Sequence, residues 1–122
     1  AVQHQLPVKV LILNNQYMGM VRQWQEMLHG GRYSESYVAA LPDFTRLAEA
    51  FGAVGLRADY PDQVDDVIRT MIGTDQVVIA DIAVDPAENC YPMIPSGAAH
   101  TDMILGPEEG SPEITDSGLA LV

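Results

Sequence analysis

Two patterns of hydrophobic and polar positions alternate along this chain, and together they predict strands separated by helices. Residues 8–13 and 77–84 are short, nearly continuous aliphatic runs, typical of parallel strands that are covered on both faces. Residues 17–28 and 61–72 instead place apolar side chains three and four positions apart, as in helices with one hydrophobic face. Strands that alternate with helices in this way indicate an α/β fold with a doubly wound parallel sheet and right-handed crossovers.

The middle of the chain adds one more helix and one more strand. Pro42 and Asp43 favour a helix start, because proline suits the first turn and a carboxylate stabilises the positive end of the helix dipole. Gly52 ends this helix. Residues 53–58 then form a short strand, although Gly55 lowers its strand propensity.

Beyond Asp85 the regular pattern is lost, because closely spaced prolines and glycines exclude a long helix or strand. We expect residues 1–84 to be the C-terminal part of a ligand-binding α/β domain. Residues 85–105 carry apolar anchors and are expected to form an ordered strap across the sheet or a lid. Residues 106–122 are expected to be a flexible acidic tail.

Composition and charge exclude several classes of function. The chain has 122 residues, of which 48% are hydrophobic, so a globular domain is expected rather than disorder. Its formal net charge is −11 and Lys9 is the only lysine, which argues against a nucleic-acid-binding surface. No apolar run is long enough for a membrane span. The lone Cys90 excludes an internal disulfide framework and fits a reducing cytoplasm.

The most informative stretch for chemistry is the corner at which the first strand ends. Asn14 and Asn15 stop the aliphatic run, and short amide side chains can bind backbone, water or a cation. Ligands of open α/β sheets bind at this carboxyl edge. The helix that follows directs its free N–H groups toward the corner, which favours a phosphate, and Gly19 allows close approach. The residues therefore suggest a phosphorylated ligand with a metal ion, or else an ordinary turn capped by asparagine.

A family resemblance extends this interpretation. Residues 13–25, which include Asn14-Asn15-Gln16-Tyr17-Met18-Gly19, resemble the second half of the thiamine-diphosphate motif of acetolactate synthase (acetohydroxyacid synthase) large subunits. Further segments that resemble that family's C-terminal domain follow in the same order, namely Gly31-Arg32-Tyr33-Ser34, Leu41-Pro42-Asp43-Phe44, residues 47–52, residues 55–57 and residues 89–97. The likeness covers about residues 1–105. The Gly-Asp-Gly half of the motif would precede Val8, so we expect the chain to be a C-terminal piece of a longer protein and inactive alone.

The resemblance implies a set of cofactor ligands. The side-chain oxygen of Asn15 and the backbone carbonyl of Tyr17 would hold Mg²⁺, which bridges the diphosphate of thiamine diphosphate. The other cofactor-binding residues implied lie in the following turn and helix, namely Met18, Gly19, Met20 and Val21. FAD would bind outside this chain. No catalytic residue is assigned here, because the activating glutamate of the family belongs to another domain of a neighbouring subunit.

The resemblance also implies substrates and partners. The enzyme would decarboxylate pyruvate and join the two-carbon unit to pyruvate or 2-oxobutyrate, in the biosynthesis of isoleucine, valine and leucine. Trp24 and Met20 would line the pocket for the acceptor 2-oxo acid, although Trp24 lies on the hydrophobic stripe of its helix and could simply be a core residue. A second large subunit, in a homodimer or higher oligomer, and a regulatory small subunit are the implied partners, in a bacterial cytoplasm.

Two other interpretations stay open. One is a different thiamine-diphosphate enzyme, such as a 2-oxo acid decarboxylase or glyoxylate carboligase, against which Trp24 and residues 90–97 argue. The other is a non-catalytic α/β binding module in which the asparagine corner is only a turn. His4, His29 and His100 have no metal-ligand spacing, so we expect no zinc site.

Overall fold

The computed structural model describes residues 1–107, which form two compact units. The first unit combines Ala1–Tyr17 with Val38–Pro86, and the second combines Met18–Tyr37 with the described residues from Ala87 onward. The predicted acidic tail falls almost entirely outside the described residues. Within residues 1–107, no helix is both long and apolar enough to cross a membrane.

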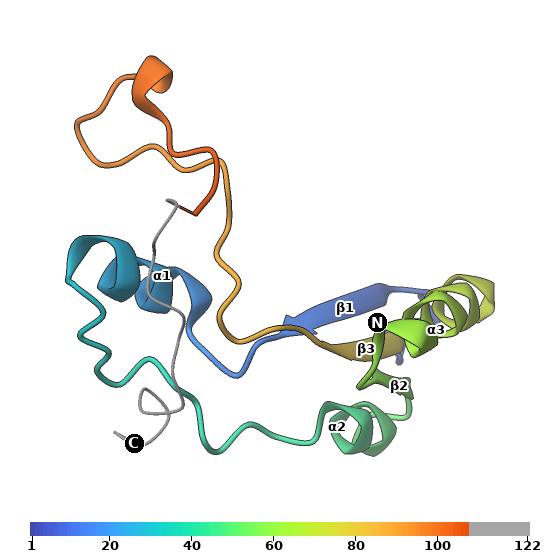
Figure 1. The fold of residues 1–122 in the computed structure, drawn as a ribbon. Helices are drawn as coiled ribbons and strands as arrows, with labels where there is room; N and C mark the ends of the chain where they lie inside the picture. The colour runs from blue at the N-terminus through green and yellow to red at the C-terminus, as the bar shows by residue number, and fades with distance from the viewer. Residues whose placement is uncertain (108–122) are drawn as a thin grey trace. The chain divides into compact units, whose positions relative to one another are not determined.

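The first unit is built on a parallel sheet of three strands with the order β1-β3-β2 (Figure 1). The strands are β1 (Lys9–Asn14), β2 (Val54–Ala58) and β3 (Val78–Ala83). Strand β3 pairs with both neighbours, with Leu11 and Leu56 each opposite Ala80. The predicted parallel α/β fold is confirmed, and the nearly continuous apolar run of residues 77–84 is the central strand.

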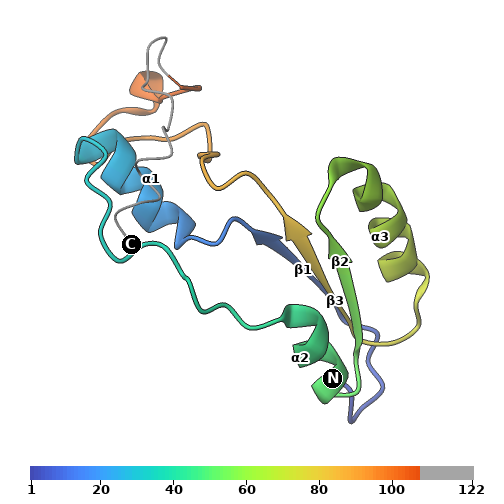
Figure 2. The ribbon, with the colours of Figure 1, turned by 60° about the horizontal axis from the view of Figure 1, so that its bottom comes forward.

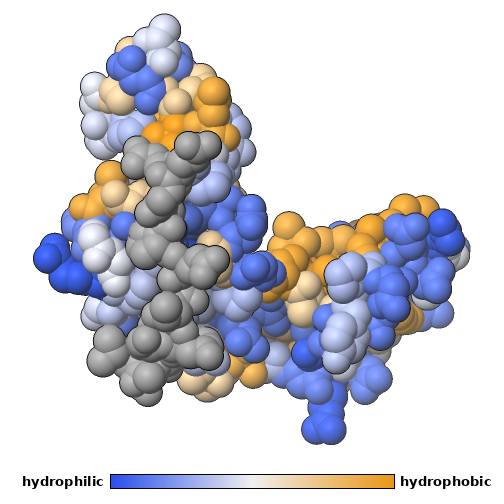
Figure 3. Space-filling model, viewed as in Figure 1, coloured by the Kyte–Doolittle hydropathy of each residue, from blue (hydrophilic) through white to orange (hydrophobic). Residues whose placement is uncertain are grey.

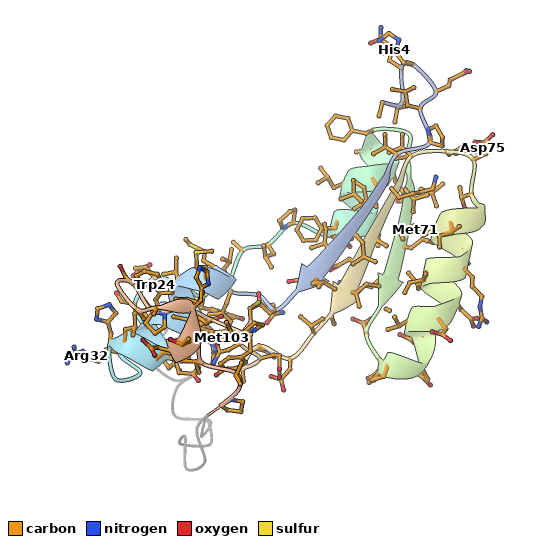
Figure 4. The ribbon with its side chains drawn as sticks, turned by 90° about the horizontal axis from the view of Figure 1, so that it is seen from above. His4, Trp24, Arg32, Met71, Asp75 and Met103 are labelled. Atoms are coloured by element: carbon orange, nitrogen blue, oxygen red, sulfur yellow. The ribbon has the colours of Figure 1, made fainter. Side chains whose placement is uncertain are left out.

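Two helices, α2 (Phe44–Ala50) and α3 (Pro61–Gly73), pack on opposite faces of this sheet (Figure 2). The chain crosses the sheet in one direction from β1 to β2 and returns from β2 to β3, so right-handed crossovers require opposite faces. The hydrophobic core lies between α3 and the sheet, where Met71 points toward the strands (Figure 4). The other buried members of this cluster are Ala58, Val78, Ala80 and Ile82.

On the other face, Gly55 is what lets α2 approach the sheet closely. A Cβ atom at this position would lie 2.6 Å from the Cα atom and from the carbonyl oxygen of Thr45. Those are backbone atoms, which a rotamer change does not move. The glycine that lowers the strand propensity of residues 53–58 is therefore required by helix packing.

Helix α2 begins at Phe44, after the two residues, Pro42 and Asp43, that were expected in its first turn. Asp43 is the N-cap, and its carboxylate accepts hydrogen bonds from the hydroxyl of Thr45 at 2.6 Å and from the N–H groups of Thr45 and Arg46 at 3.0 and 3.1 Å. These bonds, above all that of the Thr45 hydroxyl, hold the pKa of Asp43 below its usual value. The cap fixes where the helix starts.

The first strand is not covered on both faces, although its composition predicts such cover. Among residues 1–107, β1 lies at the edge of the sheet, and its apolar side chains remain accessible, with Leu13 67% exposed. Figure 3 shows hydrophobic side chains gathered on the surface over β1. The expectation was wrong for this sheet because composition records how apolar a strand is but not which elements cover it.

In the described residues the second unit contains helix α1 (Gly19–Leu28) and residues 87–107, which include a short 3₁₀ helix, η1 (His100–Asp102). An antiparallel bridge joins Met93 to Ile104, with hydrogen bonds of 2.9 and 2.8 Å, and closes this segment into a loop. The structural division therefore groups residues 18–37 with the segment expected as a strap or lid.

Replacing Gly55 by alanine should destabilise the first unit. Because the new methyl group would meet the Thr45 backbone, α2 has to shift, and we expect a loss of roughly 1–3 kcal/mol in the free energy of unfolding. Urea denaturation followed by circular dichroism measures it. Gly73→Ala is the matched control, since no atom lies within 4 Å of its added Cβ. Equal effects of the two substitutions would contradict this account.

Lys9 should be a second stability determinant. Its ammonium group donates hydrogen bonds to the carbonyls of Pro7 (3.1 Å), Thr74 (2.7 Å) and Gln76 (2.7 Å), and so ties β1 to the end of α3. Hydrogen bonds from a charged donor contribute about 1.5–3 kcal/mol. Lys9→Met should therefore lower the free energy of unfolding by about this amount, which is observed as a lower urea midpoint. Arg69→Met removes a charge from a side chain that is 74% exposed and should leave the midpoint nearly unchanged.

Candidate functional site

The asparagine corner at the end of β1 consists of two successive side-chain-to-backbone turns. The side-chain oxygen of Asn14 accepts the N–H of Gln16 at 3.1 Å, and that of Asn15 accepts the N–H of Tyr17 at 3.0 Å. Gln16 adopts a left-handed backbone conformation with φ of 60°, and its carbonyl accepts the N–H of Val38 at 2.9 Å. The corner is thus held by its own asparagine side chains and by the backbone of Val38.

The donor set at this corner suits a hard cation. Asn15 is half-buried, and a side-chain carbonyl oxygen has a second lone pair when one accepts an N–H group. Amide and backbone carbonyl oxygens are ligands that Mg²⁺ accepts alongside phosphate. Among residues 1–107, no group of three or more His, Cys, Asp or Glu side chains could hold a metal ion. Oxygen atoms of Asn15 and Tyr17 fit the proposed ion chemically, while their role as ligands stays a prediction.

The start of α1 carries the remaining predicted cofactor-binding residues, Met18, Gly19, Met20 and Val21, in the second unit. Met18 is the N-cap residue and provides no side-chain hydrogen bond to the helix, and the first turn contains no acidic residue. The first N–H groups of a helix are therefore available to an anion here. The N–H of Met18 itself is held by the carbonyl of Ser36 at 2.8 Å.

Ser36 is a polar residue near this helix start that sequence reasoning missed. It is 1% exposed, and within residues 1–107 its hydroxyl oxygen has no hydrogen-bond partner. A buried hydroxyl without a partner costs free energy, so it is expected to find one in a ligand or a water molecule. Nothing in the polar segment of residues 32–37 distinguishes Ser36 from Ser34 before the fold is known.

The hydrophobic stripe of α1 faces outward. Met20 is 76% exposed and Trp24 is 41% exposed, and together with Val21, Gln25 and His29 they line a pocket of about 470 Å³. In the described residues Trp24 therefore lies on a pocket wall and not in a closed core. Its contact with an acceptor substrate stays a prediction.

The opposite, polar side of α1 is buried instead. Arg22 is 3% exposed and Gln23 is 7% exposed, and both contact the segment that begins at Ala87. A helix with its charged side inside and its apolar side outside reverses the usual arrangement of a surface helix. The spacing of Arg22 and Glu26 indicates an ion pair within the helix, but no sequence signal shows that it is buried.

A parallel sheet flanked by helices, with a polar corner at its carboxyl edge, places this chain among the open α/β domains, a class whose ligands bind at that edge. Comparison with known proteins identifies its family. The family described as "Thiamine pyrophosphate enzyme, C-terminal TPP binding domain" matches residues 1–82, and the chain belongs to this family.

The curated relatives include acetolactate synthase large subunits. The chain is 42% identical over 112 residues to the acetolactate synthase isozyme 3 large subunit of Escherichia coli K12, a match that covers 89% of this chain and 20% of that protein. It is 40% identical over 111 residues to the large subunit of Haemophilus influenzae, with 89% and 19% covered. The chain thus spans about one fifth of the length of the relatives it matches.

A solved structure supports the fold. The thiamine diphosphate-dependent 4-hydroxybenzoylformate decarboxylase of Rhodococcus jostii RHA1 superposes with a TM-score of 0.62 at 25% sequence identity. The match covers 70% of this chain and 16% of that one. The thiamine-diphosphate-binding fold that the sequence predicts is therefore confirmed.

Proposed function

We propose that this chain is the C-terminal cofactor-binding portion of an acetolactate synthase large subunit. The observation that carries the proposal is the identity of about two residues in five with such subunits over 89% of the chain. The asparagine corner and the helix start without a side-chain cap support it, because their oxygen atoms and N–H groups match a cation bound to a diphosphate.

The roles we assign to this chain concern binding and orientation. Asn15 and the Tyr17 carbonyl hold Mg²⁺, and the N–H groups near Gly19 and Met20 orient the diphosphate. Thiamine diphosphate, when bound, supplies the electron sink for decarboxylation of pyruvate and for joining the two-carbon unit to a second 2-oxo acid. Trp24 and Met20 form an apolar wall that positions the acceptor and excludes water.

The complete enzyme contains more than this chain. We propose that it acts in branched-chain amino-acid biosynthesis as a homodimer or larger assembly, with a regulatory small subunit and with FAD bound in another domain. We assign no catalytic residue to residues 1–122. The chain alone is expected to be inactive, because the remaining metal ligand and the activating glutamate of the proposed enzyme lie in other parts of the protein.

A second candidate is a thiamine-diphosphate-dependent 2-oxo acid decarboxylase. The structural similarity to the 4-hydroxybenzoylformate decarboxylase favours this candidate, since the same fold serves both reactions. The two candidates differ in their products. Incubation of the full-length protein with pyruvate yields acetolactate if the first proposal is correct, and an aldehyde if the second is correct.

Asn15→Ala in the full-length protein should weaken binding of thiamine diphosphate in the presence of Mg²⁺. Loss of an oxygen ligand to a charged group costs about 1.5–3 kcal/mol, which corresponds to a roughly ten- to hundredfold increase in Kd. Isothermal titration calorimetry measures it. Asn14→Ala is the matched control, because it removes the same kind of turn at the neighbouring residue. If Asn15→Ala has the same Kd for the cofactor as Asn14→Ala, Asn15 is not a ligand.

Trp24→Leu should change the choice of acceptor. The smaller side chain removes part of the apolar wall of the pocket of about 470 Å³, so the preference for 2-oxobutyrate over pyruvate should fall by roughly tenfold. Competition between the two acceptors, with both products quantified, gives the ratio directly. Leu28→Ala is the control, since Leu28 lies on the same helix and does not line this pocket. An unchanged ratio in Trp24→Leu would remove Trp24 from the acceptor site.

A further inference from the structure

The buried polar side of α1 is held by a group of hydrogen bonds that we call the polar clasp, formed by Arg22, Gln23 and Glu26 with the segment 87–93. The side chain of Gln23 forms two hydrogen bonds with the backbone of Cys90, one with its N–H and one with its carbonyl. Its side-chain oxygen accepts the N–H of Cys90 at 2.9 Å, and its amide nitrogen donates to the Cys90 carbonyl at 3.1 Å. The same nitrogen lies 3.0 Å from the sulfur of Met93. Gln23 thereby holds the backbone of the segment much as a neighbouring strand would.

Arg22 holds the segment just before Cys90. Its guanidinium donates to the carbonyl of Ala87 and to the side-chain oxygen of Asn89, both at 3.2 Å, and pairs with Glu26 at 3.0 Å. Its guanidinium carbon lies 5.3 Å from the ring centroid of Tyr33. A buried arginine is tolerated because Glu26 balances its charge and several acceptors satisfy its N–H groups.

Glu26 completes the clasp from the same helix face. Its carboxylate accepts hydrogen bonds from the side-chain nitrogen of Asn89 at 2.9 Å and from the hydroxyl of Tyr33 at 3.2 Å. The polar side of α1 is therefore covered both by the segment 87–93 and by the loop that follows the helix. These directional contacts favour one rotation of the helix about its own axis, in which Met20 and Trp24 face outward.

We propose that Arg22 and Gln23 are positioning residues for Trp24: the polar clasp fixes the rotation of α1 and so presents the Met20 and Trp24 wall to the acceptor substrate. The identity of that substrate rests on the function proposed above, whereas the clasp itself does not. Neither residue contacts the reacting atoms in this account. Each acts through the orientation of the helix.

Two residues of the chain allow closure of the polar clasp to be measured by fluorescence. Trp24 is its only tryptophan and Cys90 is its only cysteine, and Cys90 is an exposed free thiol. Trp24 adjoins Gln23 in the helix, and Gln23 holds the backbone of Cys90. A nitroxide attached to Cys90 should therefore quench the fluorescence of Trp24 while the clasp is closed.

Gln23→Met tests the clasp in the 122-residue chain. Methionine keeps the length and the helix propensity of glutamine but cannot form the pair of hydrogen bonds to Cys90, so quenching should fall at least twofold. Gln25→Met is the matched control, because Gln25 lies two residues on in the same helix and donates to Ser34 instead. Gln23→Glu keeps the acceptor for the Cys90 N–H and should retain part of the quenching. Absence of quenching in the parent chain, or full quenching in Gln23→Met, would overturn the clasp.

The consequence for the acceptor is tested in the full-length protein. Gln23→Met should raise the KM for 2-oxobutyrate about tenfold, while kcat with pyruvate alone and the affinity for thiamine diphosphate stay within about twofold of the parent. A merely destabilised protein would lose all three together, which would overturn the positioning role. If the parent protein has no carboligase activity, the proposed function fails, whereas the quenching experiment still decides whether the clasp exists.

Discussion

The first unit depends on one constraint, which is that β3 must form hydrogen bonds on both of its edges while lying buried between two helices. Parallel pairing with β1 and β2 satisfies its backbone and places Asn14 beside Ala83 at the carboxyl edge. The asparagine corner owes its position to this register, because the N–H of Val84 bonds to the carbonyl of Asn14 at 3.1 Å. A slip of one residue would turn the aliphatic side chains of β3 to the other faces of the sheet.

Burial of β3 also includes a carboxylate. Asp81 is 3% exposed, and its charge is balanced by Arg57 on the neighbouring strand at 3.5 Å, which in turn pairs with Asp59 at 2.7 Å. The hydrogen bond with Asp59 raises the pKa of Arg57 above its ordinary value. Asp81 is buried while Arg57 is half exposed, so an arrangement that separates them would leave the Asp81 carboxylate buried without its charged partner, which is costly. The pair therefore favours the observed register of β2 and β3.

In the second unit, hydrogen bonding of polar side chains decides which side of a helix is buried. Helix α1 buries Arg22 and Gln23 rather than its apolar stripe, because the segment from Ala87 offers backbone carbonyls and N–H groups that need partners. The apolar stripe is then left to face a pocket. An accessible Trp24 is thus a consequence of where the polar side chains of α1 found their hydrogen bonds.

Sequence alone determined the features that depend on local pattern. The alternation of aliphatic runs and helical stripes gives the parallel α/β class, and the residues around Asn15 and Gly19 carry the resemblance to the thiamine-diphosphate family that comparison confirmed. These signals are local because strand, helix and turn preferences act over a few residues.

Tertiary structure alone decided which surfaces are covered. In the part of the chain that the structure describes, the apolar strand β1 lies at an edge, Gly55 is needed for the approach of Thr45, and the polar side of α1 is the buried one. Each of these depends on a segment distant in sequence, and periodicity gives the faces of an element but not its neighbours. The physical reason is that burial is a property of pairs of elements, whereas a pattern belongs to one element at a time.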